Sequence, residues 1–236
     1  SGCGGMSLGV EDACRTVGLD VEHVLAIDIL ESAERVYRKN FNPDEFLRGN
    51  IENIVNGEIG EEFTESELSL KRKLGKIHMV VGGPPCQGHS ALNNHSSRKR
   101  QGKERKGFDG FSGDDKNQLY LRMARFVEIT MPEIVIIENV TEVVHSKGDL
   151  VGKTKAWLSD LGYGVDCGNI RAVDIGVPQN RRRHFTIGIL GKDFNFKESI
   201  VPKRKDSPRN VMWAIEDLID RKGETTFDTP ANHKIQ

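Results

Sequence analysis

The sequence predicts an α/β fold with a mostly parallel sheet, followed by the start of a small second domain. Strand-like and helix-like segments alternate, and several of the strand-like segments are continuous apolar runs, as in sheets covered on both faces. This alternation stops near residue 191, where a polar and charged stretch begins. We therefore expect a first domain over residues 1–191 and the beginning of a second over 192–236.

The individual elements follow from hydrophobic periodicity and from end signals. Apolar runs predict strands at 23–28, 77–83, 133–140, 163–170 and 183–191. Amphipathic patterns predict helices at 6–17, 30–41, 65–74, 117–130, 150–162 and 210–219. The string TESE at 64–67 predicts a capping box at the start of the third helix.

Composition narrows the class of protein. The 236 residues contain no apolar run of the ~20 residues that a membrane span needs, so we expect no membrane association. The four cysteines show neither CxxC pairing nor zinc-type spacing, so we predict no metal site and an intracellular, reducing environment. With a net charge of -1, any nucleic-acid contact must use a local basic patch.

Functional-looking groups stand at the ends of three predicted strands: Asp28, Cys86 and Glu138. In open α/β sheets, ligands bind at the carboxyl ends of the strands, which makes this edge the candidate site. The glycine-rich start SGCGG runs into a helix and suits either a nucleotide-like ligand or a tight turn. Asp28 follows at the distance of a ribose-binding acid, although it could equally cap the next helix.

The string GGPPCQ is the most specific in the chain. Two prolines stiffen the turn that presents Cys86, which favours a nucleophile over a small buried hydrophobe. An ordinary thiol has a pKa of ~8.5, so the site must assist it or the substrate must be activated. Glu138 follows a strongly apolar strand and is either a proton donor or an acid that reaches solvent.

Two basic stretches complete the candidate site. QNRRR places Arg181 and Arg183 on one side of a strand start and Arg182 on the other, unless it is simply a solvated turn. A long irregular segment after Cys86 contains the cluster Arg98, Lys99 and Arg100, which suits phosphate contact or a solvated loop. We expect residues 92–115 to be mobile without DNA.

These strings, in this order, resemble the motifs of the cytosine-C5 DNA methyltransferase family, with a Rossmann-like methyltransferase fold that uses S-adenosylmethionine. SGCGGMSLG, AID at 26–28, RGNI at 48–51, GGPPCQGHS, KNQL at 116–119, ENV at 138–140 and QNRRR carry the resemblance, which covers residues 1 to about 191. It implies a chain without the first strand, most of the target-recognition domain and the C-terminal motifs. The family commonly has an aspartate where this chain has Asn50.

The resemblance implies a role for each matching residue. Catalytic roles fall on Cys86 as nucleophile and on Glu138, Arg181 and Arg183 as groups that bind the cytosine ring. Contacts to S-adenosylmethionine fall on Ser1, Gly2, Cys3, Gly4, Gly5, Asp28, Ile29, Asn50, Ile51, Pro84 and Leu119. Contacts to DNA fall on Gln87, Ser90, Arg98, Lys99 and Arg100.

The predicted function is therefore methyl transfer to C5 of a flipped cytosine in double-stranded DNA through a covalent Cys86 adduct. We expect a monomer, with a cognate restriction endonuclease as its functional counterpart. Three alternatives stay open: a tRNA cytosine-5 methyltransferase of the same fold, a non-catalytic DNA-binding relative, and a nicotinamide oxidoreductase. The last explains the glycine loop but leaves PPCQ and QNRRR without a role.

Overall fold

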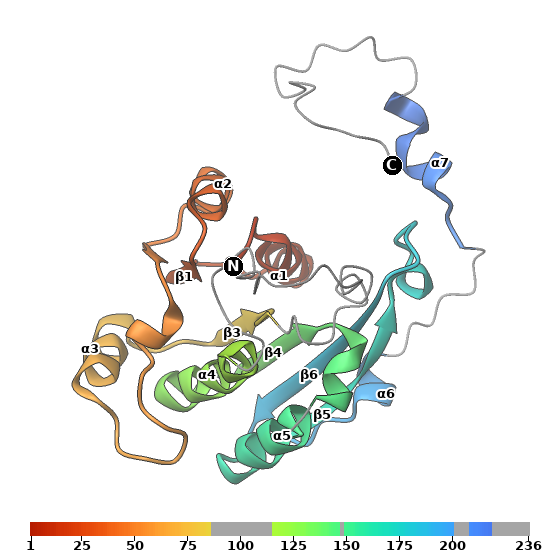
Figure 1. Cartoon of the computed structure of the whole chain (residues 1–236). Coiled ribbons are helices and arrows are strands. Elements are labelled where there is room, and N and C mark those ends of the chain that lie inside the picture. The colour runs from red at the N-terminus through yellow and green to blue at the C-terminus, as the bar shows by residue number, and fades with distance from the viewer. Residues whose placement is uncertain (86–114, 147–148, 201–207, 219–236) are drawn as a thin grey trace, which may run out of the picture. The chain divides into compact units, whose positions relative to one another are not determined.

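The computed structural model describes residues 1–85, 115–146, 149–200 and 208–218 (Figure 1). The chain divides into two compact units, one of residues 1–170 with 182–201, the other of residues 171–181 with 202–236. The domain boundary expected near residue 191 stays a prediction. In the described part of the chain, every helix is too short or too polar to cross a membrane.

A two-stranded parallel sheet begins the first unit. Helix α1 (Gly5–Thr16) is followed by β1 (Leu25–Asp28), and α2 (Glu31–Phe41) then connects β1 to β2 (Glu45–Arg48). The two strands pair in parallel, with Asp28 opposite Arg48. A small core of Ala26, Tyr37 and Phe46 holds α2 against this sheet.

The segment after β2 contains η1 (Ile51–Asn53) and α3 (Glu65–Leu74). The predicted capping box is confirmed: Thr64 caps α3, and the Glu67 side chain accepts from the Thr64 backbone N–H. A second core joins this segment to the rest of the unit, with Val55, Leu70 and Ile129 among its buried side chains.

A four-stranded sheet with the order β3-β4-β6-β5 forms the rest of the first unit. β3 (Met79–Gly82) is parallel to β4 (Ile134–Asn139), whereas β6 (Arg182–Leu190) is antiparallel to β4 and lies beside β5 (Tyr163–Arg171). Helices α4 (Asp115–Thr130) and α5 (Leu150–Asp160) pack on the sheet (Figure 1). Tyr120, Val135 and Leu158 belong to the core between them. The two parallel ladders confirm the mostly parallel α/β prediction.

Several short elements lie between or after these. η4 (Thr141–His145) follows β4, η5 (Ala172–Ile175) follows β5, and α6 (Phe196–Ile200) follows β6. In the second unit, α7 (Val211–Ile215) continues into η6 (Glu216–Leu218), where the sequence predicts one helix over 210–219. The α7 side chains Val211, Met212 and Trp213 are exposed.

Candidate active site

The strand topology of the first unit gathers predicted functional residues at the ends of strands. β1 ends at Asp28, β3 runs into Pro84, and β4 carries Glu138 as its next-to-last residue. Because β6 runs antiparallel to β4, its first residues lie beside the last residues of β4. Glu138 and Arg183, which are far apart in sequence, therefore meet at one edge of the sheet.

Glu138 and Arg183 form an ion pair at this edge. Arg183 Nε lies 2.8 Å from Glu138 Oε1, and each side chain is 25% exposed. The carboxylate is thus fixed in position while one side stays open to solvent. Gly83 gives it room, because a Cβ at Gly83 would lie 3.0 Å from Glu138 Oε2.

The turn after β3 is held by β4. Asn139 Nδ2 donates to the Pro84 carbonyl at 3.0 Å, and Asn139 Oδ1 accepts from Val140 N at 2.8 Å. Asn139 is buried, with 4% of its surface exposed. Sequence reasoning assigned no role to Asn139, although its place directly after Glu138 in ENV was a usable signal.

Asp28 is the centre of a hydrogen-bond network at the end of β1. Its Oδ2 accepts from Gly2 N at 2.8 Å, and its Oδ1 accepts from Leu30 N at 3.0 Å. Burial raises the pKa of Asp28, but the hydrogen bonds from the backbone of Leu30 and Gly2 favour the ionised form, and the pKa is lowered overall. Leu30, and not Asp28, occupies the cap position of α2.

The glycine-rich start lies directly against β1. The Ser1 hydroxyl both donates to Ile27 O and accepts from Ile27 N, each at 2.9 Å. Gly4 has a φ of 89°, and a Cβ there would come within 2.0 Å of the Phe41 ring. Only glycine satisfies both the backbone angle and the close packing at this position. Gly5 begins α1, and the neighbouring Cys3 is exposed.

The other residues predicted to contact the cofactor differ in exposure, hydrogen bonding and packing. Ile29 is 41% exposed, directly after Asp28. The Asn50 side chain bonds to Glu52, donating to Oε2 at 2.7 Å and accepting from the backbone N–H at 3.2 Å. Ile51 packs against the second core, and Leu119 is half-buried on α4.

The remaining predicted site residues lie either in the second unit or outside the described residues. Arg181 precedes β6 and belongs to the second unit, where its carbonyl accepts from Ala172 N. The predicted nucleophile and DNA-contacting residues lie outside the described residues: Cys86, Gln87, Ser90, Arg98, Lys99 and Arg100. The segment 92–115, expected to be mobile, lies outside them too, apart from its last residue.

A buried ion pair that the sequence did not reveal joins α4 to the first turn of α3. Arg125 Nη2 lies 2.8 Å from Glu67 Oε2, and both side chains are 0% exposed. Arg125 also donates to the carbonyls of Glu61 and Glu62, and Glu67 accepts from Gly57 N. Burial favours the neutral carboxyl, but the bonds from Arg125, Thr64 and Gly57 outweigh it and lower the pKa of Glu67.

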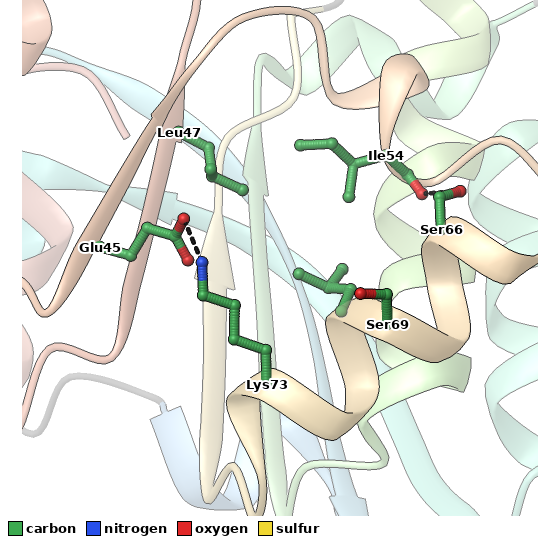
Figure 2. Close-up of a pocket in the computed structure, with 7 residues that line it drawn as sticks. Glu45, Leu47, Ile54, Ser66, Ser69 and Lys73 are labelled. Atoms are coloured by element: carbon green, nitrogen blue, oxygen red, sulfur yellow. Dashed lines mark hydrogen bonds and ion pairs between the residues drawn. The ribbon is translucent and has the colours of Figure 1, made fainter.

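One shallow pocket of about 180 Å³ lies between β2 and α3 (Figure 2). Glu45 and Lys73 face each other across it, with 2.5 Å between Oε1 and Nζ. The lining residues are Glu45, Leu47, Ile54, Ser66, Ser69, Leu70 and Lys73, and none of them is a predicted site residue. Within the described ranges, no cluster of three or more His, Cys, Asp or Glu side chains could hold a metal ion.

Solved structures resemble this arrangement. A candidate DNA modification methyltransferase encoded within an E. coli prophage aligns with a TM-score of 0.63 and 25% identity, over 91% of this chain and 52% of that one. Dnmt2 methyltransferase of S. pombe aligns with a TM-score of 0.57 over 89% of this chain and 56% of that one. At 21% identity, this second likeness concerns the fold alone.

Sequence relatives define the family. Type II methyltransferase M1.BsuMI of Bacillus subtilis is 37% identical over the whole chain, which spans 52% of its length. DNA (cytosine-5)-methyltransferase 1 of Gallus gallus is 32% identical over 78% of this chain and 11% of its own. The chain therefore spans about half the length of its bacterial relatives. The family model for C-5 cytosine-specific DNA methylase matches residues 1–235, and the chain belongs to this family.

Proposed function

We propose that the protein carrying this chain transfers a methyl group from S-adenosylmethionine to C5 of a cytosine in double-stranded DNA. The observation that carries the proposal is the Glu138–Arg183 pair beside the turn that leads to Cys86. A carboxyl group and a guanidinium beside the turn that precedes Cys86 in the sequence match the needs of covalent catalysis on a cytosine ring. Family membership and the M1.BsuMI relative support the DNA substrate.

The residues near β1 fit the polar part of the proposed cofactor. Asp28, with its lowered pKa, stays ionised near neutrality, and Oδ1 accepts only one described hydrogen bond. A carboxylate oxygen can accept a second, which leaves capacity for a ribose hydroxyl. The close packing of Gly4 on Phe41 keeps the glycine turn against the sheet. Bound there, S-adenosylmethionine would supply an electrophilic methyl group.

For methyl transfer to occur, residues of this chain must make C5 of cytosine nucleophilic. We infer that the Cys86 thiolate adds to C6, which moves the C5–C6 π electrons towards C5 so that C5 can take the methyl group. A base then removes the C5 proton, the C5–C6 double bond re-forms, and the sulfur leaves C6. The prolines at 84 and 85 restrict the backbone before the thiol and reduce the entropy lost on attack.

Glu138 and Arg183 stabilise the charge that develops during this attack. We place the Glu138 carboxyl at N3 of the ring and an arginine, Arg183 or Arg181, at O2. Both contacts strengthen as electron density moves onto the ring, so they stabilise the transition state more than the ground state. The partial exposure of the described pair leaves the carboxyl accessible to a ring edge.

DNA recognition requires that the cytosine leaves the helix. A base inside a duplex cannot reach Cys86, so we infer that the enzyme flips the target nucleotide. Arg98, Lys99 and Arg100 supply phosphate contacts, with Gln87 and Ser90 closer to the nucleophile. By analogy with the Type II relatives, we infer a companion restriction endonuclease.

The decisive experiment uses DNA with 5-fluorocytosine at the target position. Fluorine at C5 cannot be eliminated as a proton is, so the enzyme should stay covalently attached to the DNA when the cofactor is present. Mass spectrometry of the digested adduct should place the bond on Cys86, and Cys86→Ala should abolish both adduct and methyl transfer. An adduct that persists in Cys86→Ala, or that maps to Cys3, Cys14 or Cys167, overturns the mechanism. Methyl transfer to tRNA without methyl transfer to DNA overturns the assignment of DNA as the substrate.

A further inference from the structure

Helix α1 is held to its neighbours by two polar side chains that lie one turn apart. Ser7 Oγ lies 2.7 Å from the Tyr37 hydroxyl on α2, and Glu11 Oε1 accepts from His23 Nε2 at 2.8 Å. Residues i and i+4 of a helix share a face, so both contacts leave the same side of α1. His23 Nδ1 in turn lies 3.4 Å from the Tyr37 hydroxyl. These four residues, the α1 anchor, join α1, α2 and the segment before β1 in one closed set of polar contacts.

The α1 anchor is largely shielded from water. Ser7 is 8% exposed and Tyr37 is 3% exposed, and the His23 side chain is 11% exposed. Burial raises the pKa of the Tyr37 phenol above its usual value, so this hydroxyl keeps its proton and can donate it. A buried hydroxyl that loses its partner regains little from solvent. Removal of one member of the anchor therefore weakens the attachment of α1.

The aromatic rings of the anchor also support the glycine turn, through Phe41. The Phe41 ring centroid lies 5.3 Å from that of His23 and 4.8 Å from that of Tyr37. Atoms of the Phe41 ring occupy the space that a Cβ at Gly4 would need. Because Gly4 directly precedes α1, Phe41 packs against the glycine turn at the point where the helix begins.

The glycine turn is thus held at two separate points. At one, Gly2 N donates to Asp28 Oδ2 at 2.8 Å. At the other, the turn packs on Phe41 at Gly4 and continues into a helix that the α1 anchor attaches to α2. The first point belongs to the edge where we place the cofactor, whereas the second lies behind the turn and in the core around Tyr37.

We propose that Tyr37, His23 and Glu11 are positioning residues, which hold the glycine turn in the conformation that receives S-adenosylmethionine. The inference rests on the proposed function, in which this cofactor binds beside Asp28. The three residues act through Phe41 and the first turn of α1 and need not touch the ligand. A turn that is ordered before binding loses less conformational entropy on binding. When only a fraction of the molecules has the competent turn, the apparent Kd rises in inverse proportion to that fraction.

The test compares Tyr37→Phe with Tyr163→Phe in the protein that carries the complete chain. Both variants remove one buried, hydrogen-bonded hydroxyl and keep the ring. Tyr163 is also 3% exposed, and its hydroxyl donates to the Pro132 carbonyl at 2.6 Å, in the core of the four-stranded sheet. We expect Tyr37→Phe to raise the Kd for S-adenosylmethionine about fivefold, as the loss of one ordinary hydrogen bond implies. Tyr163→Phe should keep the Kd within twofold, and both variants should methylate at the wild-type rate when the cofactor is saturating.

Two further measurements distinguish positioning of the turn from a general loss of stability. Without cofactor, hydrogen exchange over residues 2–8 should be faster in Tyr37→Phe than in the wild type, but unchanged in Tyr163→Phe. Ser7→Ala removes the other partner of the same bond, so the double variant with Tyr37→Phe should bind no more weakly than the weaker single variant. His23→Gln keeps an amide that can donate to Glu11 and should bind more tightly than His23→Leu.

The outcomes separate this inference from the proposed function. If the wild type binds S-adenosylmethionine and the Kd of Tyr37→Phe rises less than threefold, the positioning role is overturned and the proposed function stands. The same holds if Tyr163→Phe raises the Kd as much as Tyr37→Phe does. A wild-type protein that shows no binding of S-adenosylmethionine in calorimetry overturns both the proposed function and this inference.

Discussion

Arg183 and Glu138 are held 2.8 Å apart, Nε to Oε1, by the antiparallel pairing of β6 with β4. Glu138 is paired with Phe185 in that register, and Arg183 lies two residues earlier on the same face. The guanidinium therefore approaches the carboxylate diagonally from the neighbouring strand. Both groups stay partly exposed, at 25% each, and Arg183 Nη1 also donates to the Arg182 carbonyl at 2.7 Å.

Replacing Arg183 should affect chemistry more than folding. We expect Arg183→Ala to lower the rate of methyl transfer by about 10²–10³-fold, because one charge-stabilising contact is lost. Arg183→Lys should recover part of this, since it keeps the charge but not the planar donor geometry. The neighbouring Arg182→Ala removes the same charge from an exposed side chain and serves as the control. Equal rates in Arg182→Ala and Arg183→Ala would contradict the assignment.

Gly83 should tolerate no side chain without displacing Glu138. A Cβ at this position would lie 3.0 Å from Glu138 Oε2 and 3.6 Å from its backbone oxygen. We expect Gly83→Ala to reduce methyl transfer by roughly 10–10²-fold through a shifted carboxylate, while cofactor binding persists. Gly9→Ala in α1 has open space and should leave the rate unchanged. Single-turnover kinetics of both variants provide the comparison.

The buried Arg125–Glu67 pair should contribute strongly to the stability of the contact between α4 and α3. Glu67→Gln leaves the Arg125 charge without its buried partner and should lower the free energy of unfolding by about 3–5 kcal/mol. Glu34→Gln removes the partner of the partly exposed Arg38 and should cost less than about 1 kcal/mol. Urea unfolding of the two variants measures the difference. Similar losses in both would mean that burial of the pair adds little.

His184 should make the fold sensitive to mild acid. Burial lowers the pKa of His184, and the positive charge of Lys155 lowers it further. Below pH ~6.5, His184 therefore binds a proton in the unfolded chain but not in the folded chain. The free energy of unfolding then decreases as the pH is lowered, by up to about 1.4 kcal/mol per pH unit. His184→Gln should lack this slope, whereas replacement of the exposed His145 should keep it. Unfolding free energies of the wild type and of both variants at pH 7.5 and 5.5 test this prediction.

The parts of the fold that the sequence predicted are those with strong local signals. Apolar runs gave β3, β4 and β6 to within a few residues, and the TESE string gave the start of α3. The strand β2 was missed because Glu45–Arg48 is short and half polar, and its conformation depends on pairing with β1. Such a strand has no periodicity of its own to detect.

In the candidate site too, the sequence predicted residues that have a local signal and missed contacts that depend on tertiary structure. Apolar runs predicted that Asp28 and Glu138 stand at strand ends, although β1 and β4 belong to different sheets. The partners of these residues depend on tertiary structure: Arg183 reaches Glu138 only through antiparallel pairing, and Asn139 reaches Pro84 across two strands. Glu67 was predicted only as a cap, since a charged residue in a helix carries no mark of complete burial.

The separation of the β1–β2 ladder from the four-stranded sheet has a consequence for cooperativity. No strand is shared between the two described sheets, so amide protons of β1 and β2 can become exposed without breaking a hydrogen bond of β3, β4 or β6. Native-state hydrogen exchange should then show two groups of amides with different opening free energies. A ligand that contacts Asp28 and the end of β4 together would merge the two groups, because opening either sheet would require its release.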